Sequence, residues 1–160
     1  MDASAALIAA LTRRGWRVAV AESLTGGLLV AELTSVPGAS AAVSGGVVAY
    51  DVEVKSSVLG VDAELLARVG PVDAEVARQL AEGVRHALAV GGSAADLGIA
   101  TTGVAGPDPH GGFKPGTVWL GASIRGELHA LPLNLAGTRD EIRSQTVVRA
   151  IRWVNELLGV

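Results

Sequence analysis

The sequence contains no cysteine, and only five of its 160 residues are aromatic. The absence of cysteine excludes disulfide bonds, thiolate metal sites and a cysteine nucleophile, and it favours a cytoplasmic protein. The three histidines, His86, His110 and His129, are scattered along the chain and lack the spacing of metal ligands. We therefore expect no metal site and no bound cofactor.

Basic residues are few, and they form no cluster. The sequence has 13 lysines and arginines against 16 acidic residues, which gives a formal net charge of −3. Proteins that bind nucleic acids usually carry a basic patch or stripe, so we expect no nucleic-acid partner. No apolar run is long enough to span a bilayer, and the first residues lack the pattern of a signal peptide. We expect no membrane partner either.

Hydrophobic residues make up 49% of the chain, mostly as Ala, Val, Leu and Ile, which suits a single domain over residues 1–160. Apolar periodicity and turn residues predict helices at 4–14, 26–35, 51–60, 62–69, 73–90 and from 138 onwards. They predict strands at 17–21, 43–50, 96–102, 117–124 and 128–133. Because helices and strands alternate, we predict an α/β fold, a three-layer α/β/α sandwich with a mixed, mostly parallel β-sheet. The last two strands are predicted to form a hairpin around Arg125-Gly126.

Ser23 lies in the segment Ala-Glu-Ser-Leu-Thr-Gly-Gly, between an apolar run that suits a strand and one that suits a helix. In one interpretation Ser23 only caps the following helix. In the other it is an exposed nucleophile. Gly26 and Gly27 would let a substrate approach the backbone, and unpaired N–H groups at the helix start near Thr25 would hold an oxyanion.

A serine nucleophile needs a base, and Lys55 is the candidate. If Asp51 caps a short helix, Lys55 lies in its first turns, where the helix dipole and desolvation both lower the pKa of an ammonium group. A lysine whose pKa is low enough can accept a serine proton. Tyr50 either supports this pair or only packs with its hydroxyl at the rim. The alternative for Lys55 is a solvated surface lysine.

Small residues fill the segment Thr-Gly-Val-Ala-Gly-Pro at 102–107, which ends a predicted strand and begins a long loop. They leave room for a sugar or a phosphate, although the same pattern suits a tight turn. The segment is not a phosphate-binding P-loop, because Gly112-Phe113 stands where that motif has Lys followed by Ser or Thr.

Arg139 and Arg143 lie one turn apart in the last predicted helix, which Thr138 and Glu141 open with a capping-box pattern. Cations in the first turns of a helix oppose its dipole. Either acidic neighbours compensate these arginines, or an anionic ligand such as a phosphate rests against them.

Five motifs in this order resemble the CinA C-terminal-domain family. They are Ala-Glu-Ser-x-Thr-Gly-Gly at 21–27, Tyr50 with Lys55, Thr-Gly-Val-Ala-Gly-Pro at 102–107, Lys-Pro-Gly-Thr-Val at 114–118 and Gly-Thr-Arg-x-x-Ile-Arg at 137–143. The resemblance covers nearly the whole chain. It implies a metal-independent enzyme of pyridine nucleotide salvage that hydrolyses the carboxamide of nicotinamide mononucleotide to nicotinate mononucleotide and ammonia. It also implies a homo-oligomer, expected to be a dimer.

Matching motif positions imply that Ser23 is the nucleophile, Lys55 its base and Tyr50 a supporting catalytic group. The nucleotide-binding residues expected from the motifs and the glycine pattern are Thr25, Gly26, Gly27, Gly46, Thr102, Gly103, Gly106, Arg139 and Arg143. Of the two arginines, Arg143 is the one expected to meet the phosphate. The family usually reads Lys-Pro-Val-Gly-Thr-Val where this chain is one residue shorter, after Lys114. A nucleotide-binding or regulatory module without activity therefore stays open as an alternative. A DNA-uptake role is disfavoured by the net charge.

Overall fold

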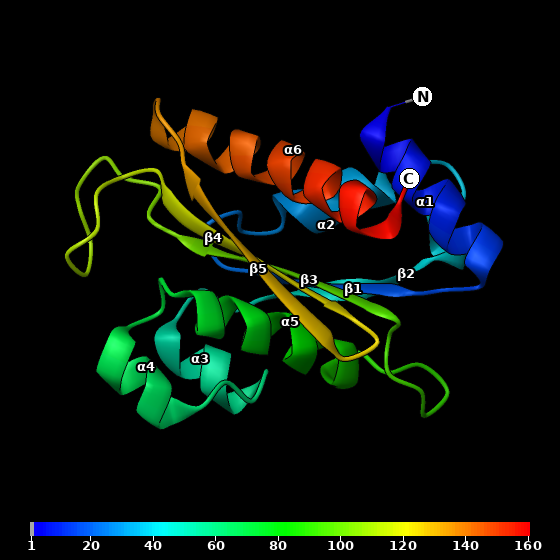
Figure 1. Cartoon of the computed structure of the whole chain (residues 1–160), viewed down its shortest axis with the longest axis horizontal. Coiled ribbons are helices and arrows are strands. Elements are labelled where there is room, and N and C mark those ends of the chain that lie inside the picture. Colours follow the sequence, from blue (N-terminus) through cyan, green and yellow to red (C-terminus); the bar gives the residue numbers. More distant parts are fainter. Residues whose placement is uncertain (1) are drawn as a thin grey trace.

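The computed structural model describes residues 2–160, in which five strands form one mixed sheet between two layers of helices (Figure 1). The strands are β1 (Val18–Glu22), β2 (Val43–Val48), β3 (Leu97–Gly103), β4 (Thr117–Ile124) and β5 (Glu127–Asn134). The helices are α1 (Ala3–Arg14), α2 (Leu28–Thr34), α3 (Val52–Ser57), α4 (Ala63–Val69), α5 (Ala74–Ala87) and α6 (Arg139–Leu158), with a short 3₁₀ helix, η1, at Ala39–Ala41.

The strand order is β2-β1-β3-β4-β5. β1 pairs in parallel with β2 and β3, whereas β4 pairs antiparallel with β3 and β5. β4 therefore runs against the other four strands, and the predicted hairpin of β4 and β5 is confirmed. The predicted mixed α/β/α sandwich is confirmed as well.

The two faces of the sheet bury different halves of the core because successive side chains of a strand point to opposite sides. In β1, Val18 and Val20 pack on the side of α1, α2 and α6. Ala19 and Ala21 pack on the opposite side, which α5 and α4 cover. Helices thus cover both faces of the sheet (Figure 1), and its central strands β1, β3 and β4 are largely buried.

Glycines let α5 lie unusually close to the sheet. A Cβ atom on Gly98 of β3 would stand 1.9 Å from the Ala81 carbonyl oxygen, and one on Gly121 of β4 would stand 2.0 Å from that of Ala77. Real side chains do not fit at such distances, so these positions exclude every residue but glycine. This close contact places α5 against the middle of the sheet.

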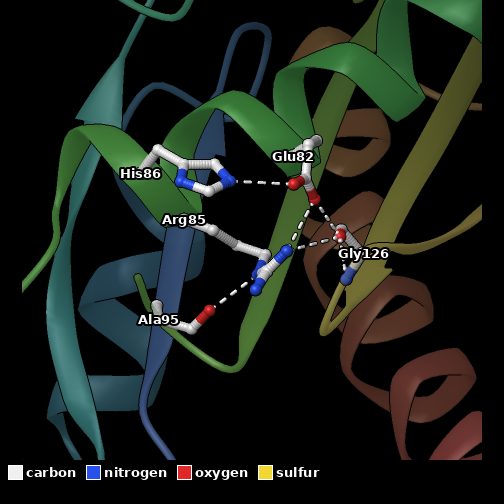
Figure 2. A network of polar contacts seen from close by, with 6 residues as sticks. Glu82, Arg85, His86, Ala95 and Gly126 are labelled. Atoms are coloured by element: carbon white, nitrogen blue, oxygen red, sulfur yellow. Dashed lines mark hydrogen bonds and ion pairs between the residues drawn. The ribbon is translucent and has the colours of Figure 1, made fainter. Parts of the chain in front are cut away.

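A polar network ties α5 to the β4–β5 hairpin (Figure 2). The Glu82 carboxylate accepts hydrogen bonds from the Ser123 hydroxyl, from Arg85 at 2.8 Å and from the His86 ring at 2.9 Å. Burial acts to raise the pKa of Glu82, but these hydrogen bonds outweigh it and lower the pKa to about 2. Ser123 is fully buried in β4, so the network joins the two elements from inside the fold.

Capping residues set the helix ends that matter for the site. The Asp51 side chain accepts the Glu53 N–H at 2.8 Å at the start of α3, which confirms it as the cap. Thr138 and Glu141 form the predicted capping box of α6. α2 begins at Leu28, two residues later than predicted, because Gly26 and Gly27 adopt positive φ angles of 57° and 105° in a turn.

Candidate active site

The candidate site lies at the carboxyl ends of the parallel strands, where ligands usually bind in open α/β sheets. Ser23 directly follows β1, Lys55 lies in α3 after β2, and Thr102 and Gly103 end β3. The loop between β3 and β4 and the start of α6 meet at the same end of the sheet (Figure 1). Residues far apart in the sequence are therefore gathered by the strand order.

Ser23 stands on a turn and does not cap a helix. The cap of α2 is Gly27, so the capping interpretation of Ser23 is wrong. The Ser23 backbone N–H donates to the carbonyl oxygen of Thr101 in β3 at 3.1 Å. The Thr101 hydroxyl lies 2.8 Å from that of Thr25, which fixes the middle of the turn to the same strand.

The first N–H groups of α2 are already occupied. The Leu29 and Val30 N–H groups donate to the Glu22 carboxylate at 2.8 and 3.0 Å, and that of Leu28 donates to the Thr25 carbonyl at 3.0 Å. The expectation that N–H groups of the helix hold an oxyanion is therefore corrected for the first residues of α2 itself, Leu28 to Val30.

The turn itself still offers free donors. Among the hydrogen bonds of residues 2–160, the backbone N–H groups of Leu24, Thr25 and Gly27 have no acceptor. That of Gly26 donates to the Ser23 carbonyl at 3.1 Å.

Lys55 is buried, with 1% of its surface exposed, so it is not a solvated surface lysine. Its Nζ donates to Ser23 Oγ at 2.9 Å, to the Ala49 carbonyl at 2.6 Å and to the Tyr50 carbonyl at 3.4 Å. Burial lowers the pKa of Lys55 from 10.5 to about 8, against the opposing effect of the Asp51 carboxylate. At pH 7 a minor fraction of the molecules, about 9%, therefore carries a neutral amine, far more than for a lysine with the ordinary pKa.

The three partners of Lys55 determine where a neutral amine directs its lone pair. Carbonyl oxygens only accept hydrogen bonds, so the carbonyls of Ala49 and Tyr50 engage the two N–H groups of the amine. The remaining direction points at Ser23 Oγ. The arrangement can therefore remove the hydroxyl proton of Ser23.

The Tyr50 hydroxyl faces Arg139 of α6, whereas only the backbone carbonyl of Tyr50 contacts Lys55. The Arg139 Nη2 donates to that hydroxyl at 3.2 Å, and its Nη1 donates to the Gly106 carbonyl at 2.6 Å. The Tyr50 side chain is also 61% exposed. Tyr50 thus joins Arg139 and the long loop at the rim.

A pocket of about 460 Å³ opens over Ser23 and Lys55. Seven of the predicted residues line it, namely Ser23, Tyr50, Lys55, Thr102, Gly103, Gly106 and Arg139. The volume lies within the range of small-molecule sites.

Two of the lining residues, Thr102 and Gly103, also lie close to neighbouring backbone carbonyls. The Thr102 hydroxyl donates to the Pro71 carbonyl at 2.7 Å. A Cβ on Gly103 would stand 2.7 Å from the Thr117 carbonyl oxygen.

The other predicted binding residues lie outside the pocket wall. Thr25, Gly26 and Gly27 form the turn beside it. Gly46 lies in β2, where a Cβ would stand 3.0 Å from the Cβ of Val30, so its lack of a side chain is explained by helix packing.

Arg143 braces the Ser23 turn. Its Nε donates to the Leu24 carbonyl at 2.9 Å and its Nη2 to the Thr25 carbonyl at 3.4 Å. Its Nη1 also lies 3.7 Å from Asp140. The pocket wall includes Arg139 and not Arg143, although the two lie one turn apart on the same helix. The expectation that Arg143 meets the phosphate is therefore corrected, because its guanidinium is bound to the turn.

Sequence reasoning missed several residues of the site. Glu22 and Thr101 hold the Ser23 turn, and Asp108 and His110 line the pocket from the long loop. A charged residue directly after the apolar run Val18–Ala21 was a usable signal for Glu22. Thr101 and the loop residues carried no comparable signal.

A second hollow, of about 480 Å³, lies between α1, α2 and α6. Apolar and polar residues line it in equal number, and it has no lysine or histidine beside a hydroxyl, so it lacks the pairing of serine and lysine found in the first pocket. Within residues 2–160, no group of three or more His, Cys, Asp or Glu side chains could hold a metal ion. None of the helices in the described part of the chain is long and apolar enough to cross a membrane.

Known proteins are similar to this chain in sequence and in fold. The chain matches the CinA C-terminal domain family over residues 2–158. It is 48% identical over 150 residues to a protein of Geobacillus kaustophilus named as competence-damage inducible, a match that covers 93% of this chain and 35% of that protein. A CinA-like protein of Frankia casuarinae is 45% identical over 149 residues, which cover 93% of this chain and 33% of that protein. The chain thus spans about a third of the length of these relatives.

Solved structures agree with these matches. A CinA superfamily protein of Klebsiella pneumoniae superposes with a TM-score of 0.92 at 32% identity, covering 98% of this chain and 96% of that one. The competence/damage inducible protein CihA of Agrobacterium tumefaciens gives a TM-score of 0.89 at 35% identity, covering 97% and 93%. The resemblance seen in the five motifs is confirmed, and the chain belongs to the CinA C-terminal domain family.

Proposed function

We propose that this protein is a metal-independent amidohydrolase that converts nicotinamide mononucleotide to nicotinate mononucleotide and ammonia. The observation that carries the proposal is the buried contact of 2.9 Å between Lys55 Nζ and Ser23 Oγ at the floor of the pocket. Family membership supports the same substrate class. The chemistry required is nucleophilic attack on an amide carbonyl, which a serine with an adjacent base performs.

In the acylation step, Ser23 Oγ attacks the carboxamide carbon while the neutral Lys55 amine takes the hydroxyl proton. The carbonyl oxygen becomes an oxyanion, and the free N–H groups of Leu24, Thr25 or Gly27 are the donors available to stabilise it. Lys55 then returns the proton to the leaving nitrogen. Ammonia departs, and an ester joins Ser23 to the nicotinate carbonyl.

In the deacylation step, a water molecule attacks this ester and gives its proton to Lys55. The bond between the carbonyl carbon and Ser23 Oγ breaks, and Ser23 regains a proton. The products are the free carboxylate of nicotinate mononucleotide and the resting enzyme. Lys55 thus serves as base and acid in turn.

Arg139 is the group that we assign to the substrate phosphate. Its guanidinium contacts a hydroxyl and a carbonyl, both neutral, and among residues 2–160 it forms no ion pair with a carboxylate. A phosphate at the rim would supply the missing negative charge through paired hydrogen bonds. Thr102, Gly103 and Gly106 would then line the space for the ribose.

The family resemblance further leads us to propose a cytoplasmic homodimer with neither nucleic-acid nor membrane partners. Sedimentation of the purified protein tests the dimer.

The function is tested by measuring ammonia release from nicotinamide mononucleotide, with and without EDTA. We expect steady turnover that EDTA does not change. Calorimetric titration with the same nucleotide distinguishes the alternative of an inactive binding module, which the shortened loop after Lys114 favours. Binding without ammonia release would replace the enzyme by that module.

A further inference from the structure

Glu22 is a buried carboxylate that faces no cation. It lies at the end of β1 with 1% of its surface exposed, and none of the ion pairs of residues 2–160 includes it. Its partners are the N–H groups of Leu29 and Val30 in the first turn of α2, at 2.8 and 3.0 Å. Burying a charge is costly, and the helix start stabilises an anion placed there. The carboxylate of Glu22 therefore takes the place at the start of α2 where an anionic ligand could otherwise bind.

The turn between Glu22 and α2 is also held from the opposite side. Arg143 donates to the carbonyls of Leu24 and Thr25 at 2.9 and 3.4 Å. Glu22 thus engages amide donors just after the turn, and Arg143 engages carbonyl acceptors within it. Ser23 lies between the two anchors, next to Glu22 in the chain.

From this arrangement we infer that Glu22 is a positioning residue for Ser23, an inference that rests on the proposed function. Its carboxylate fixes the start of α2 relative to the end of β1, and so fixes where Ser23 Oγ stands beside Lys55. By occupying the helix amides, it also leaves the turn amides as the donors for an oxyanion. Glu22 itself does not line the pocket.

The test substitutes Glu22→Gln, which keeps the size of the side chain. The Leu29 and Val30 N–H groups donate to different oxygens of the Glu22 carboxylate, so a glutamine in the same position sets its own NH₂ donor against one of the two N–H groups. The matched control is Glu32→Gln. It makes the same change in α2, where the carboxylate accepts from the Ser4 hydroxyl at 2.6 Å, outside the pocket wall.

The primary readout is the rate at which phenylmethanesulfonyl fluoride modifies Ser23, followed by intact mass. In this reaction the oxygen–sulfur bond forms, the sulfur–fluorine bond breaks, fluoride leaves and Lys55 takes the proton. The reagent reports the reactivity of Ser23 without reference to any substrate. The kcat and KM for nicotinamide mononucleotide and the melting temperature are measured alongside.

We expect Glu22→Gln to lower both the modification rate and kcat by about tenfold to a hundredfold, as small misplacements of reacting groups do. KM should change little, and Glu32→Gln should match the wild type in all rates. A merely structural role for Glu22 would lower the melting temperature and leave the rates of the folded protein unchanged, which would overturn the inference.

Two further outcomes separate this inference from the proposed function. If the wild type is not modified at Ser23, the proposed nucleophile is wrong and the inference is overturned with it. If the wild type and Glu22→Gln are modified equally fast, only the inference is overturned. Should Glu22→Gln fail to fold, Glu22→Asp decides, because it keeps the charge but is one methylene too short to reach both amides. A modification rate equal to that of the wild type would then overturn the inference.

Discussion

The neutral form of Lys55 should set the pH dependence of catalysis. With a pKa of about 8, the neutral fraction of Lys55 is about 3% at pH 6.5, about 9% at pH 7 and half at pH 8. Because only the neutral amine can accept the Ser23 proton, kcat/KM should rise nearly tenfold per pH unit below pH 7. It should then approach a plateau above pH 9.

Replacing Asp51 by asparagine should move the pH profile of kcat/KM to lower pH. The Asp51 carboxylate raises the pKa of Lys55, so its removal lowers that pKa further and enlarges the neutral fraction at pH 7. Asparagine still caps α3, because its side-chain oxygen can accept the Glu53 N–H. We therefore expect kcat/KM at pH 7 to rise while the plateau stays nearly the same.

The assay is kcat/KM for ammonia release between pH 6.5 and 9.5, since this quantity reports the ionisations of the free enzyme. Glu53→Gln is the matched control, because Glu53 is an exposed acid on the same helix and does not shift the pKa of Lys55. A profile for Asp51→Asn that is unmoved, or moved to higher pH, would refute the reasoning. So would a wild-type rate that stays constant from pH 6.5 to 8.

Three other predictions concern binding and stability. Arg139→Met should raise KM for nicotinamide mononucleotide about tenfold to a hundredfold. KM for nicotinamide riboside, which lacks the phosphate, should stay nearly unchanged. Equal effects on both substrates would contradict the assignment of Arg139 to the phosphate. Between about pH 8 and 10.5, Lys55 is neutral in the folded chain and still protonated in the unfolded one, so the free energy of unfolding should rise with pH. In urea unfolding, the wild type should gain up to about 3 kcal/mol over this range relative to Lys55→Met. No gain would mean that the pKa of Lys55 is that of an ordinary lysine. Glu82→Gln should lower the free energy of unfolding by about 1–3 kcal/mol at pH 7 and leave kcat unchanged. Because the pKa of Glu82 is depressed in the folded chain, this loss should shrink as the pH falls from about 4.5 towards 2. A loss that does not depend on pH would exclude the network as its cause.

Local signals in the sequence predicted most of the elements. The Asp51 cap, the capping box of Thr138 and Glu141, and the hairpin around Arg125-Gly126 all act between near neighbours, so single residues were enough to place them. The depth at which α5 packs was not predictable. It depends on Gly98, which contacts the α5 backbone, and a glycine in a strand equally suits a bulge.

The candidate site was predicted in part, and the errors concern groups whose direction is set by distant contacts. Arg139 and Arg143 share a helix face, so periodicity could not tell which of them lines the pocket. The carbonyls of the Ser23 turn engage Arg143 and leave Arg139 at the rim. Likewise, the amides at the start of α2 were expected to be free, and only the folded chain shows the Glu22 carboxylate bound to them.

Ammonia release by Ser23→Ala, compared with the wild type at pH 8, tests the central claim most directly. Calorimetry of the same variant shows whether the pocket still binds the nucleotide. The account predicts that nicotinamide mononucleotide still binds while turnover falls to the level of the buffer, because Lys55 then has no hydroxyl to deprotonate. Turnover by Ser23→Ala at the wild-type rate would contradict the account, since the amide would then be cleaved without Ser23.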